Sequence, residues 1–294
     1  MPNLKEVRNR ITSVGSTMQI TSAMKMVSAA KLKRAQDAIL QMRPYANKLK
    51  ELLQNVSSSI DVSENLYAKE TEVNNVLLIV VSSNRGLAGA FNANVIKKAW
   101  GLINNEYADK KVSVIGIGKK SHDAFRKTPH HLHLEGLNEN LSDVFDGLKF
   151  EKASPIAEAL MKAFTEGKFD RVYVIYNQFR NAAVQVTTAE RFLPIDTSSS
   201  AAAESKTSAD YIFEPSKEYI VQELIPKSLK IQFYKALLDS FASEHGARMT
   251  AMHKATDNAK EMLRNLKISY NKARQAAITT EILEIVAGAE ALKG

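Results

Sequence analysis

Two glycine-containing stretches carry residue types that bind phosphate groups in many proteins. Arg85-Gly86-Leu87-Ala88-Gly89 follows an apolar run, where α/β proteins often hold a phosphate, but it lacks the G-x-G-x-x-G order. Ile115–Ser121 resembles a P-loop, yet Ser113 stands where the motif needs glycine and Lys120 where it needs serine or threonine. We therefore interpret these glycines as tight turns from strand to helix, and we predict no bound nucleotide.

Other chemistry-bearing side chains form no recognisable catalytic set. His130, His131 and His133 cluster, but no carboxylate accompanies them in a helical ligand spacing, so a metal site is not predicted. There is no recognisable Ser-His-Asp or Cys-His arrangement, although sequence alone leaves a dispersed site open. The chain has no cysteine, which excludes disulfides and thiol switches. The prediction is a protein without a catalytic site, cofactor or metal of its own.

The glycine stretches and the histidines belong to a central region with strand-like runs. Short apolar or β-branched runs at 76–81, 112–117, 171–176 and 183–187 predict four strands, with helical stretches between the first three. This order predicts an inserted, Rossmann-like α/β domain at 74–195 with a mainly parallel sheet. Ser154-Pro155 is expected to begin one of its helices. A mobile loop is expected at 197–209, which is rich in serine and alanine.

Both ends of the chain carry the apolar repeat of a coiled coil, at 1–58 and 211–294. Thirteen of the sixteen positions that follow a 3-4 spacing from Leu4 to Val56 are apolar, and the three breaks fall together at Thr21, Lys25 and Ser28. From Tyr234 to Ala287 the same test gives twelve of sixteen apolar positions, including Ala255, Met262 and Leu283. Pro44 is expected to kink the first helix or end its straight part. The two helices should pair with each other as a long antiparallel coiled coil.

The points where the helices leave and rejoin the insert give a register. If they do so near residues 56 and 218, residue 24 lies opposite residue 250, and residue 3 opposite residue 271. Residues from about 272 to 294 then have no partner helix. A lone apolar helix is unfavourable in water, so this tip needs a sleeve from another protein.

Positive charge is concentrated in the first helix. Residues 1–58 hold ten Lys/Arg against three Asp/Glu, whereas the whole chain has a net charge of +8. A basic stripe attracts an acidic protein surface, anionic lipid or nucleic acid. One alternative is therefore a structural coiled-coil adaptor that binds nucleic acid or lipid through this helix. Another is a nucleotide-dependent enzyme that uses the α/β insert.

Three long stretches resemble one family, the gamma subunits of F-type ATP synthases. Ile20–Gln36 is similar to the N-terminal helix signature of that family. Ala255–Ala259 together with Tyr270–Ala289 is similar to its C-terminal signature, and Ser83–Asn92 to the start of its central domain. The order and spacing of these stretches fit the whole chain.

The resemblance implies a central-stalk rotor subunit. In that family the paired helices lie inside a ring of alternating alpha and beta subunits, and the central domain stands with epsilon on the membrane rotor c-ring. Proton flow turns the shaft, and ATP is made on beta. The resemblance also implies roles for single residues: coupling at Met24 and Arg248, contacts with the ring at Arg274, Gln275 and Thr279, and further coupling or subunit contacts at Lys25, Arg34 and Glu281.

The resemblance also sets the expected location. Residues 1–5 open directly into a helix pattern, without an apolar signal segment or an Arg/Ser-rich presequence. The expected place is the cytoplasmic side of a bacterial plasma (inner) membrane, as a peripheral protein. Membrane association is expected only through the complex, and no nucleic acid is expected as a partner.

Overall fold

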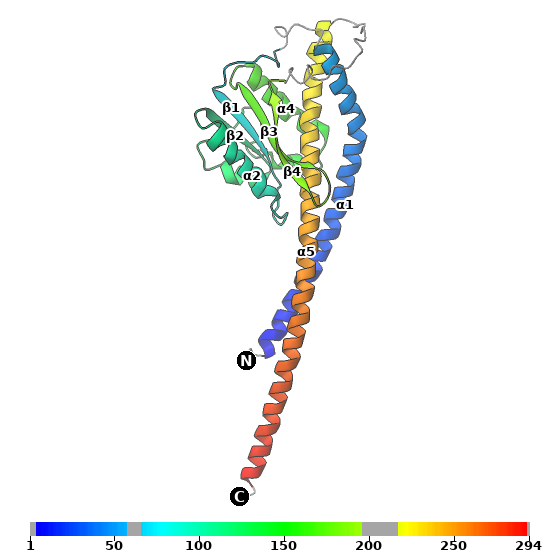
Figure 1. The fold of residues 1–294 in the computed structure, drawn as a ribbon, viewed down its shortest axis with the longest axis vertical. Helices are drawn as coiled ribbons and strands as arrows, with labels where there is room; N and C mark the ends of the chain where they lie inside the picture. The colour runs from blue at the N-terminus through cyan, green and yellow to red at the C-terminus, as the bar shows by residue number, and fades with distance from the viewer. Residues whose placement is uncertain (1–3, 58–65, 196–216, 293–294) are drawn as a thin grey trace. The chain divides into compact units, whose positions relative to one another are not determined.

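The computed structural model describes residues 4–57, 66–195 and 217–292 (Figure 1). The predicted mobile loop at 197–209 lies outside these residues. The chain packs as two units. The first unit joins residues 1–28 with 249–294, and the second comprises Ala29–Arg248.

A four-stranded sheet forms the centre of the second unit. Its strands are β1 (Asn75–Val81), β2 (Lys111–Ile117), β3 (Arg171–Phe179) and β4 (Gln185–Leu193), in the order β2-β1-β3-β4. β1 pairs in parallel with β2 and β3, while β4 runs antiparallel to β3. The predicted mainly parallel α/β sheet is therefore confirmed.

The fourth strand lies further along the chain than the sequence pattern indicated. Residues 183–187 were expected, but the strand is Gln185–Leu193. Most of its side chains are half-buried, as on an edge strand with one neighbour, so the strand shows no continuous apolar run.

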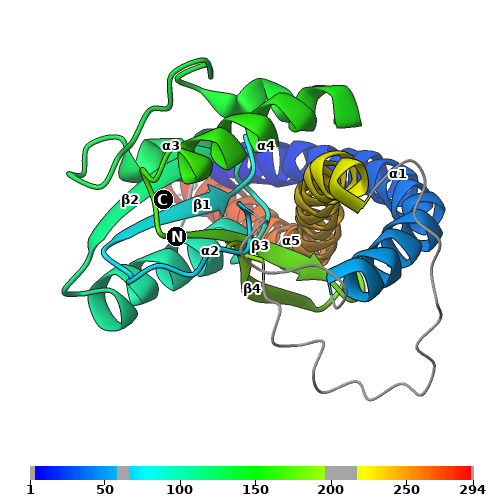
Figure 2. The same cartoon turned by 90° about the horizontal axis from the view of Figure 1, so that it is seen from above.

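Helices cover both faces of the sheet (Figure 2). On one face, α2 (Phe91–Gly101), the π-helical turn η2 (Leu102–Glu106) and Phe125 of α3 (Lys119–Phe125) pack on Val76, Leu78 and Val80. On the other face, α4 (Phe150–Thr165) and the first part of α5 (Lys217–Ala291) pack on the alternate side chains of the same strand. β1 is thus buried on both faces, which explains its unbroken apolar sequence.

The helix α4 begins one turn earlier than expected. Ser154 is not its N-cap, because the helix starts at Phe150 and contains Pro155. The ring of Phe150 packs edge-on against Tyr234, with ring centroids 5.9 Å apart. The Ser154 hydroxyl instead donates to the Glu158 carboxylate over 3.3 Å. This aromatic contact is made by the first residue of the observed helix.

The two terminal segments are long helices, α1 (Leu4–Ser57) and α5 (Lys217–Ala291). None of the predicted seam positions of α1 from Leu4 to Leu49 is exposed, as a coiled-coil seam requires. The helix continues past Pro44, and α5 likewise continues past Pro226. A 3-10 turn, η3 (Leu141–Phe145), completes the regular structure of the described residues.

Candidate functional site

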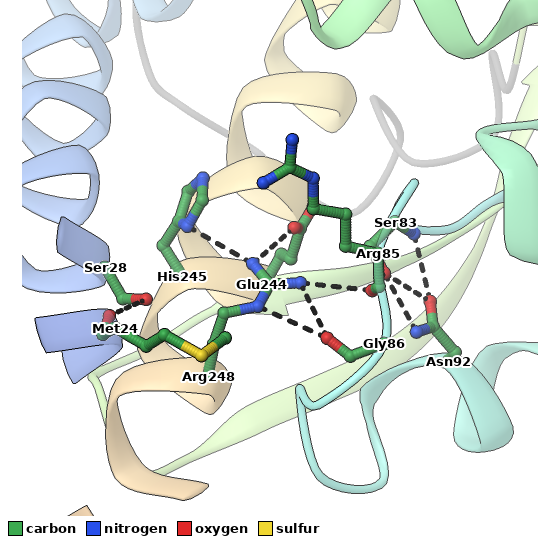
Figure 3. A network of polar contacts seen from close by, with 9 residues as sticks. All are labelled: Met24, Ser28, Ser83, Arg85, Gly86, Asn92, Glu244, His245 and Arg248. Atoms are coloured by element: carbon green, nitrogen blue, oxygen red, sulfur yellow. Dashed lines mark hydrogen bonds and ion pairs between the residues drawn. The ribbon is translucent and has the colours of Figure 1, made fainter. Parts of the chain in front are cut away.

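A buried ion pair lies on α5 within the second unit (Figure 3). Arg248 and Glu244 are separated by one helical turn, and an Arg248 Nη1 hydrogen donates to the Glu244 Oε1 atom over 2.6 Å. Only 6% of Arg248 and 7% of Glu244 is exposed. Charged side chains are rarely buried to this extent unless they are paired, so the ion pair is what allows both charges to be buried.

The same guanidinium group reaches the loop that follows β1. Its Nη2 atom donates to the carbonyl oxygens of Arg85 and Gly86 over 3.1 and 3.3 Å, and its Nε atom donates to Gly86 over 3.4 Å. The loop is also held from within, since the Ser83 amide and hydroxyl contact the Asn92 side chain over 3.0 Å. Arg248 therefore joins the last helix to the backbone of this loop.

The loop occupies the place where open α/β sheets usually bind ligands. β1 has neighbours on both sides, and the crevice outside the carboxyl ends of such strands is the usual ligand position. Here the chain's own groups meet in hydrogen bonds: Asn84 donates to the Ser142 carbonyl over 2.9 Å, and buried Asn177 donates to the Phe91 carbonyl over 3.0 Å. These contacts stabilise the loop itself.

The two glycines of the P-loop-like stretch have a packing role. A Cβ atom at Gly116 would lie 2.6 Å from the His122 amide nitrogen, and one at Gly118 would overlap the Ser82 carbonyl oxygen. Gly118 also has φ +95°, in the region that favours glycine. These residues bring the end of β2 close to α3 and to the end of β1, in agreement with the interpretation as tight turns.

His245 completes the buried cluster as a neutral side chain. Burial, assisted by the charges of Arg248 and Lys31, lowers its pKa to about 3. The Nδ1 atom lies 3.4 Å from Arg248 Nη1 and accepts its hydrogen, so the ring hydrogen resides on Nε2. Within the described residues, that buried Nε2 atom has no hydrogen-bond partner.

Burial acts in the opposite direction on the neighbouring carboxylate. It raises the pKa of Glu244, while the positive charges of Arg248, Lys31 and Arg85 oppose this rise. Of these three cations only Arg248 is buried with the carboxylate and forms an ion pair with it, whereas Lys31 and Arg85 are exposed.

The first unit contains the antiparallel seam between residues 4–28 of α1 and the second half of α5. Thr256 Oγ1 donates to Thr21 Oγ1 over 2.8 Å, Lys25 Nζ lies 3.4 Å from His253 Nδ1, and Arg8 donates to the Tyr270 hydroxyl over 2.8 Å. The predicted antiparallel pairing is confirmed.

The register of this seam corrects the sequence prediction. Residue 25 lies against residue 253 and residue 21 against residue 256, about one helical turn from the predicted positions. On α5 the predicted seam positions Met252 and Ala259 are buried as expected, but the alternate positions are displaced by one residue, because Met262 is 53% exposed while Leu263 is half-buried. The seam uses Thr256, Leu263 and Tyr270 in place of Ala255, Met262 and Ser269. The side chains that meet across the pair set the register, not the points where the helices begin.

The predicted coupling and contact residues fall into three groups. Arg248 lies in the buried cluster. Met24 and Lys25 are half-buried in the first unit, where the Met24 carbonyl accepts from the Ser28 hydroxyl over 2.8 Å. The remaining residues are exposed: Arg34 on α1, and Arg274, Gln275, Thr279 and Glu281 near the end of α5.

The end of α5 is an uncovered helix. Every residue from Ile278 to Leu292 is exposed, including Ile282, Leu283 and Ile285. The Thr279 hydroxyl donates to the Gln275 carbonyl one turn earlier, over 2.9 Å. This tip begins about six residues later than the sequence register indicated, in the same direction as the shift of the seam.

Sequence reasoning found Arg248 but missed most of what surrounds it. Glu244 stands four residues earlier on the same helix, and this spacing is the local signal that could have identified the pair. The carbonyl groups of Arg85 and Gly86 carry no side-chain signal, and His245 matches no motif. The clustered histidines bring no metal set: within residues 4–57, 66–195 and 217–292, no group of three or more His, Cys, Asp or Glu has a metal-binding arrangement.

Comparison with known proteins agrees with this geometry. The ATP synthase family matches residues 3–292. The ATP synthase gamma chains of Flavobacterium psychrophilum and Christiangramia forsetii are 60% and 57% identical over 295 residues, and each comparison covers 100% of both chains. A rotor chain of the mitochondrial ATP synthase of Euglena gracilis, in rotational state 1, has the same fold with a TM-score of 0.66 and 19% identity, over 94% of this chain and 98% of that chain. The chain therefore belongs to the ATP synthase gamma chain family.

Proposed function

We propose that this gamma chain is the central-stalk rotor subunit of a proton-translocating F-type ATP synthase, in which it couples proton flow to rotary ATP synthesis. The observation that carries the proposal is the uncovered tip of α5, from Ile278 to Leu292. A single helix with exposed isoleucine, leucine and valine side chains is marginal in water. It gains stability when another protein surrounds it, as a ring of subunits surrounds a shaft.

The paired helices supply the stiffness that a rotating part needs. In the first unit, side chains from Arg8 to Lys25 of α1 meet partners from Tyr270 to His253 of α5. Each helix restrains the bending of the other, because the seam repeats along their common length. The gamma chain is a non-catalytic subunit, and ATP is made on the catalytic subunits around it.

The proposed partners follow from the surfaces of the chain. The alpha and beta subunits of the catalytic head surround the C-terminal part of α5, where Arg274, Gln275, Thr279 and Glu281 are exposed. The cations Lys25 and Arg34 on α1 suit acidic loops of the same ring. The α/β unit contacts the epsilon subunit and the membrane rotor c-ring.

The proposed location is the cytoplasmic side of a bacterial plasma membrane, reached as a peripheral part of the complex. None of the helices that the structure describes contains a stretch both long and apolar enough to span a bilayer. We propose that the chain contacts the membrane sector only as part of the complex.

A tagged chain expressed in its own cells tests the proposal. Alpha and beta subunits, epsilon and an ATPase activity should co-purify with it from detergent-solubilised membranes. Purification without alpha and beta, together with binding to DNA or to anionic vesicles, would instead support an adaptor that acts through the basic first helix.

Single substitutions test the contact residues. Arg274→Ala and Gln275→Ala should reduce proton-driven ATP synthesis in membrane vesicles without changing the unfolding midpoint, because both side chains are exposed. Arg264→Ala removes a similar exposed charge from the paired part of α5 and serves as the matched control. Normal assembly and ATP synthesis in both the Arg274→Ala and Gln275→Ala variants would show that these two residues do not contribute to the ring contact.

A further inference from the structure

We propose that Glu244 and Arg248 form a buried latch that fixes the loop Ser83–Gly89 to the last helix and thereby positions the exposed side chain of Leu87. In this arrangement Arg248 holds the loop directly. Glu244 is a positioning residue that acts through Arg248. All the groups belong to the second unit of the chain.

The guanidinium group is suited to a contact in two directions. Its Nη1 atom is directed to the Glu244 carboxylate, while Nη2 and Nε are directed to the carbonyls of Arg85 and Gly86. A planar fork with five hydrogens can satisfy both sets of acceptors together, whereas the compact ammonium group of lysine cannot. The backbone carbonyls accept a charged donor, which gives the stronger class of hydrogen bond.

The loop needs such an anchor because of its backbone conformation. Leu87 has φ +61°, a left-handed conformation that is unusual for a residue with a large side chain, and Gly89 has φ +58°. Strained conformations of this kind persist only where the surroundings hold them. Leu87 is 65% exposed, so its own packing does not supply the restraint. The restraint comes from Asn92, which bonds Ser83, from the bond of Asn84 to Ser142, and from Arg248 at Arg85 and Gly86.

Glu244 makes the latch selective for one position of Arg248. A buried guanidinium without a counter-charge would turn toward water, and the carboxylate one turn away keeps it in the interior. A buried ion pair is weak evidence for added stability, since apolar residues of similar volume often replace one without loss. The latch is therefore expected to determine loop position more than the overall stability of folding.

The consequence for the machine rests on the proposed rotor function. A loop fixed to α5 moves with the shaft as one body, and it presents Leu87 at a constant place to any neighbouring subunit. A failure of the latch proposal can be distinguished from a failure of the rotor proposal, because loop order can be measured on the free chain alone.

The absence of cysteine from the chain allows a direct experiment. A Leu87→Cys chain carries a single thiol for a nitroxide spin label, and hydrogen exchange reports the amides of residues 85–89. Arg248→Met should mobilise the label and accelerate exchange in the loop roughly tenfold to a hundredfold, as expected for the loss of charged hydrogen bonds. Arg248→Lys should restore little of this order, and Glu244→Gln should give an intermediate result.

Two further variants separate positioning from simple destabilisation. The double variant Glu244→Met with Arg248→Met leaves no buried charge unpaired, so its unfolding midpoint should return toward that of the parent while the loop stays mobile. Asp37→Asn breaks an exposed ion pair with the same spacing, Lys33–Asp37 at 2.9 Å, and should leave the label unchanged. An immobile loop in Arg248→Met, or a loop that regains order together with stability in the double variant, would overturn the proposal.

Discussion

At the scale of the residue, His245 shows how burial controls a titration. Its side chain is 5% exposed and lies beside Arg248, with Lys31 as a second cation. Each of these factors disfavours the charged imidazolium, and together they lower the pKa to about 3. The ring therefore accepts a hydrogen bond from Arg248 at neutral pH instead of repelling it.

The lowered pKa makes His245 a source of acid sensitivity. In the unfolded chain the imidazole binds a proton near its ordinary pKa of about 6.5, while the folded chain resists protonation down to about 3. Its stabilising contribution is present above pH 6.5 and is lost as the pH falls toward 3. Between pH 7 and pH 4 this loss amounts to about 3 kcal/mol.

Replacement of His245 by glutamine tests the direction of this pH dependence. We expect the free energy of unfolding, measured by urea titration, to fall less between pH 7 and pH 4 in His245→Gln than in the parent chain. Equal falls in the two proteins would show that this imidazole does not contribute to acid destabilisation.

Two glycines with similar backbone angles offer a second test at the residue scale. Gly118 (φ +95°) and Gly136 (φ +85°) both strain an L-residue, but only Gly118 has backbone atoms where a Cβ would lie. Gly136→Ala should cost about 1 kcal/mol, the cost of the backbone conformation. Gly118→Ala should cost roughly 3 kcal/mol or more, because the Ser82 carbonyl must also move. Similar unfolding free energies for the two variants would contradict the packing role of Gly118.

At the scale of the element, the periodicity of apolar residues predicted the helix seam well, whereas the positions of the helix ends did not predict the register. The heptad pattern identified the seam of α1 because apolar residues keep one phase over its length. On α5 the pattern was ambiguous, since Met262 and Leu263 are both apolar and only one of them can face the partner helix. The register required a knowledge of which side chains meet, such as Thr21 and Thr256, and no local signal contains that information.

In the central sheet, too, locally determined features were predictable from the sequence, whereas features set by distant contacts were not. β1 and β2 were readable because burial on both faces requires unbroken apolar runs. The start of α4 was not, because the contact of Phe150 with Tyr234 joins residues far apart in the chain. The Arg248 cluster was predictable only as a helix pair with Glu244, since its other acceptors are backbone carbonyls.

Disulfide trapping tests the observed register of the seam. Thr21→Cys with Thr256→Cys should form an intramolecular disulfide rapidly on mild oxidation, because the two hydroxyl oxygens lie 2.8 Å apart. The control pair, Thr21→Cys with His253→Cys, corresponds to the register shifted by one turn and should cross-link slowly. The parent has no cysteine to interfere. Faster bond formation in the control pair would favour the shifted register.

At the scale of the whole molecule, charge and exposure are unevenly distributed along the chain. The basic excess lies in residues 1–58, whereas the exposed apolar side chains at the C-terminal end lie on a helix that none of the described residues covers. Charge of one sign steers an acidic partner toward the protein, and an uncovered apolar helix gains stability when that partner encloses it.

Removal of the tip separates folding from assembly. A chain that ends after Ala277 loses residues that are exposed from 278 to 292, so its free energy of unfolding should stay within about 0.5 kcal/mol of the parent value. A chain that ends after Ser269 also loses Tyr270 and its contact with Arg8, and should be less stable in the seam.

In the free parent chain, amides of residues 280–291 should exchange much faster than those of residues 252–266, because a lone helical end frays. Incorporation of the parent chain into the enzyme should slow that exchange. The chain ending after Ala277 should not be incorporated. If the tip were equally protected in the free chain and in the complex, the helix would be stable alone, and a surrounding ring would not be required to explain its apolar surface.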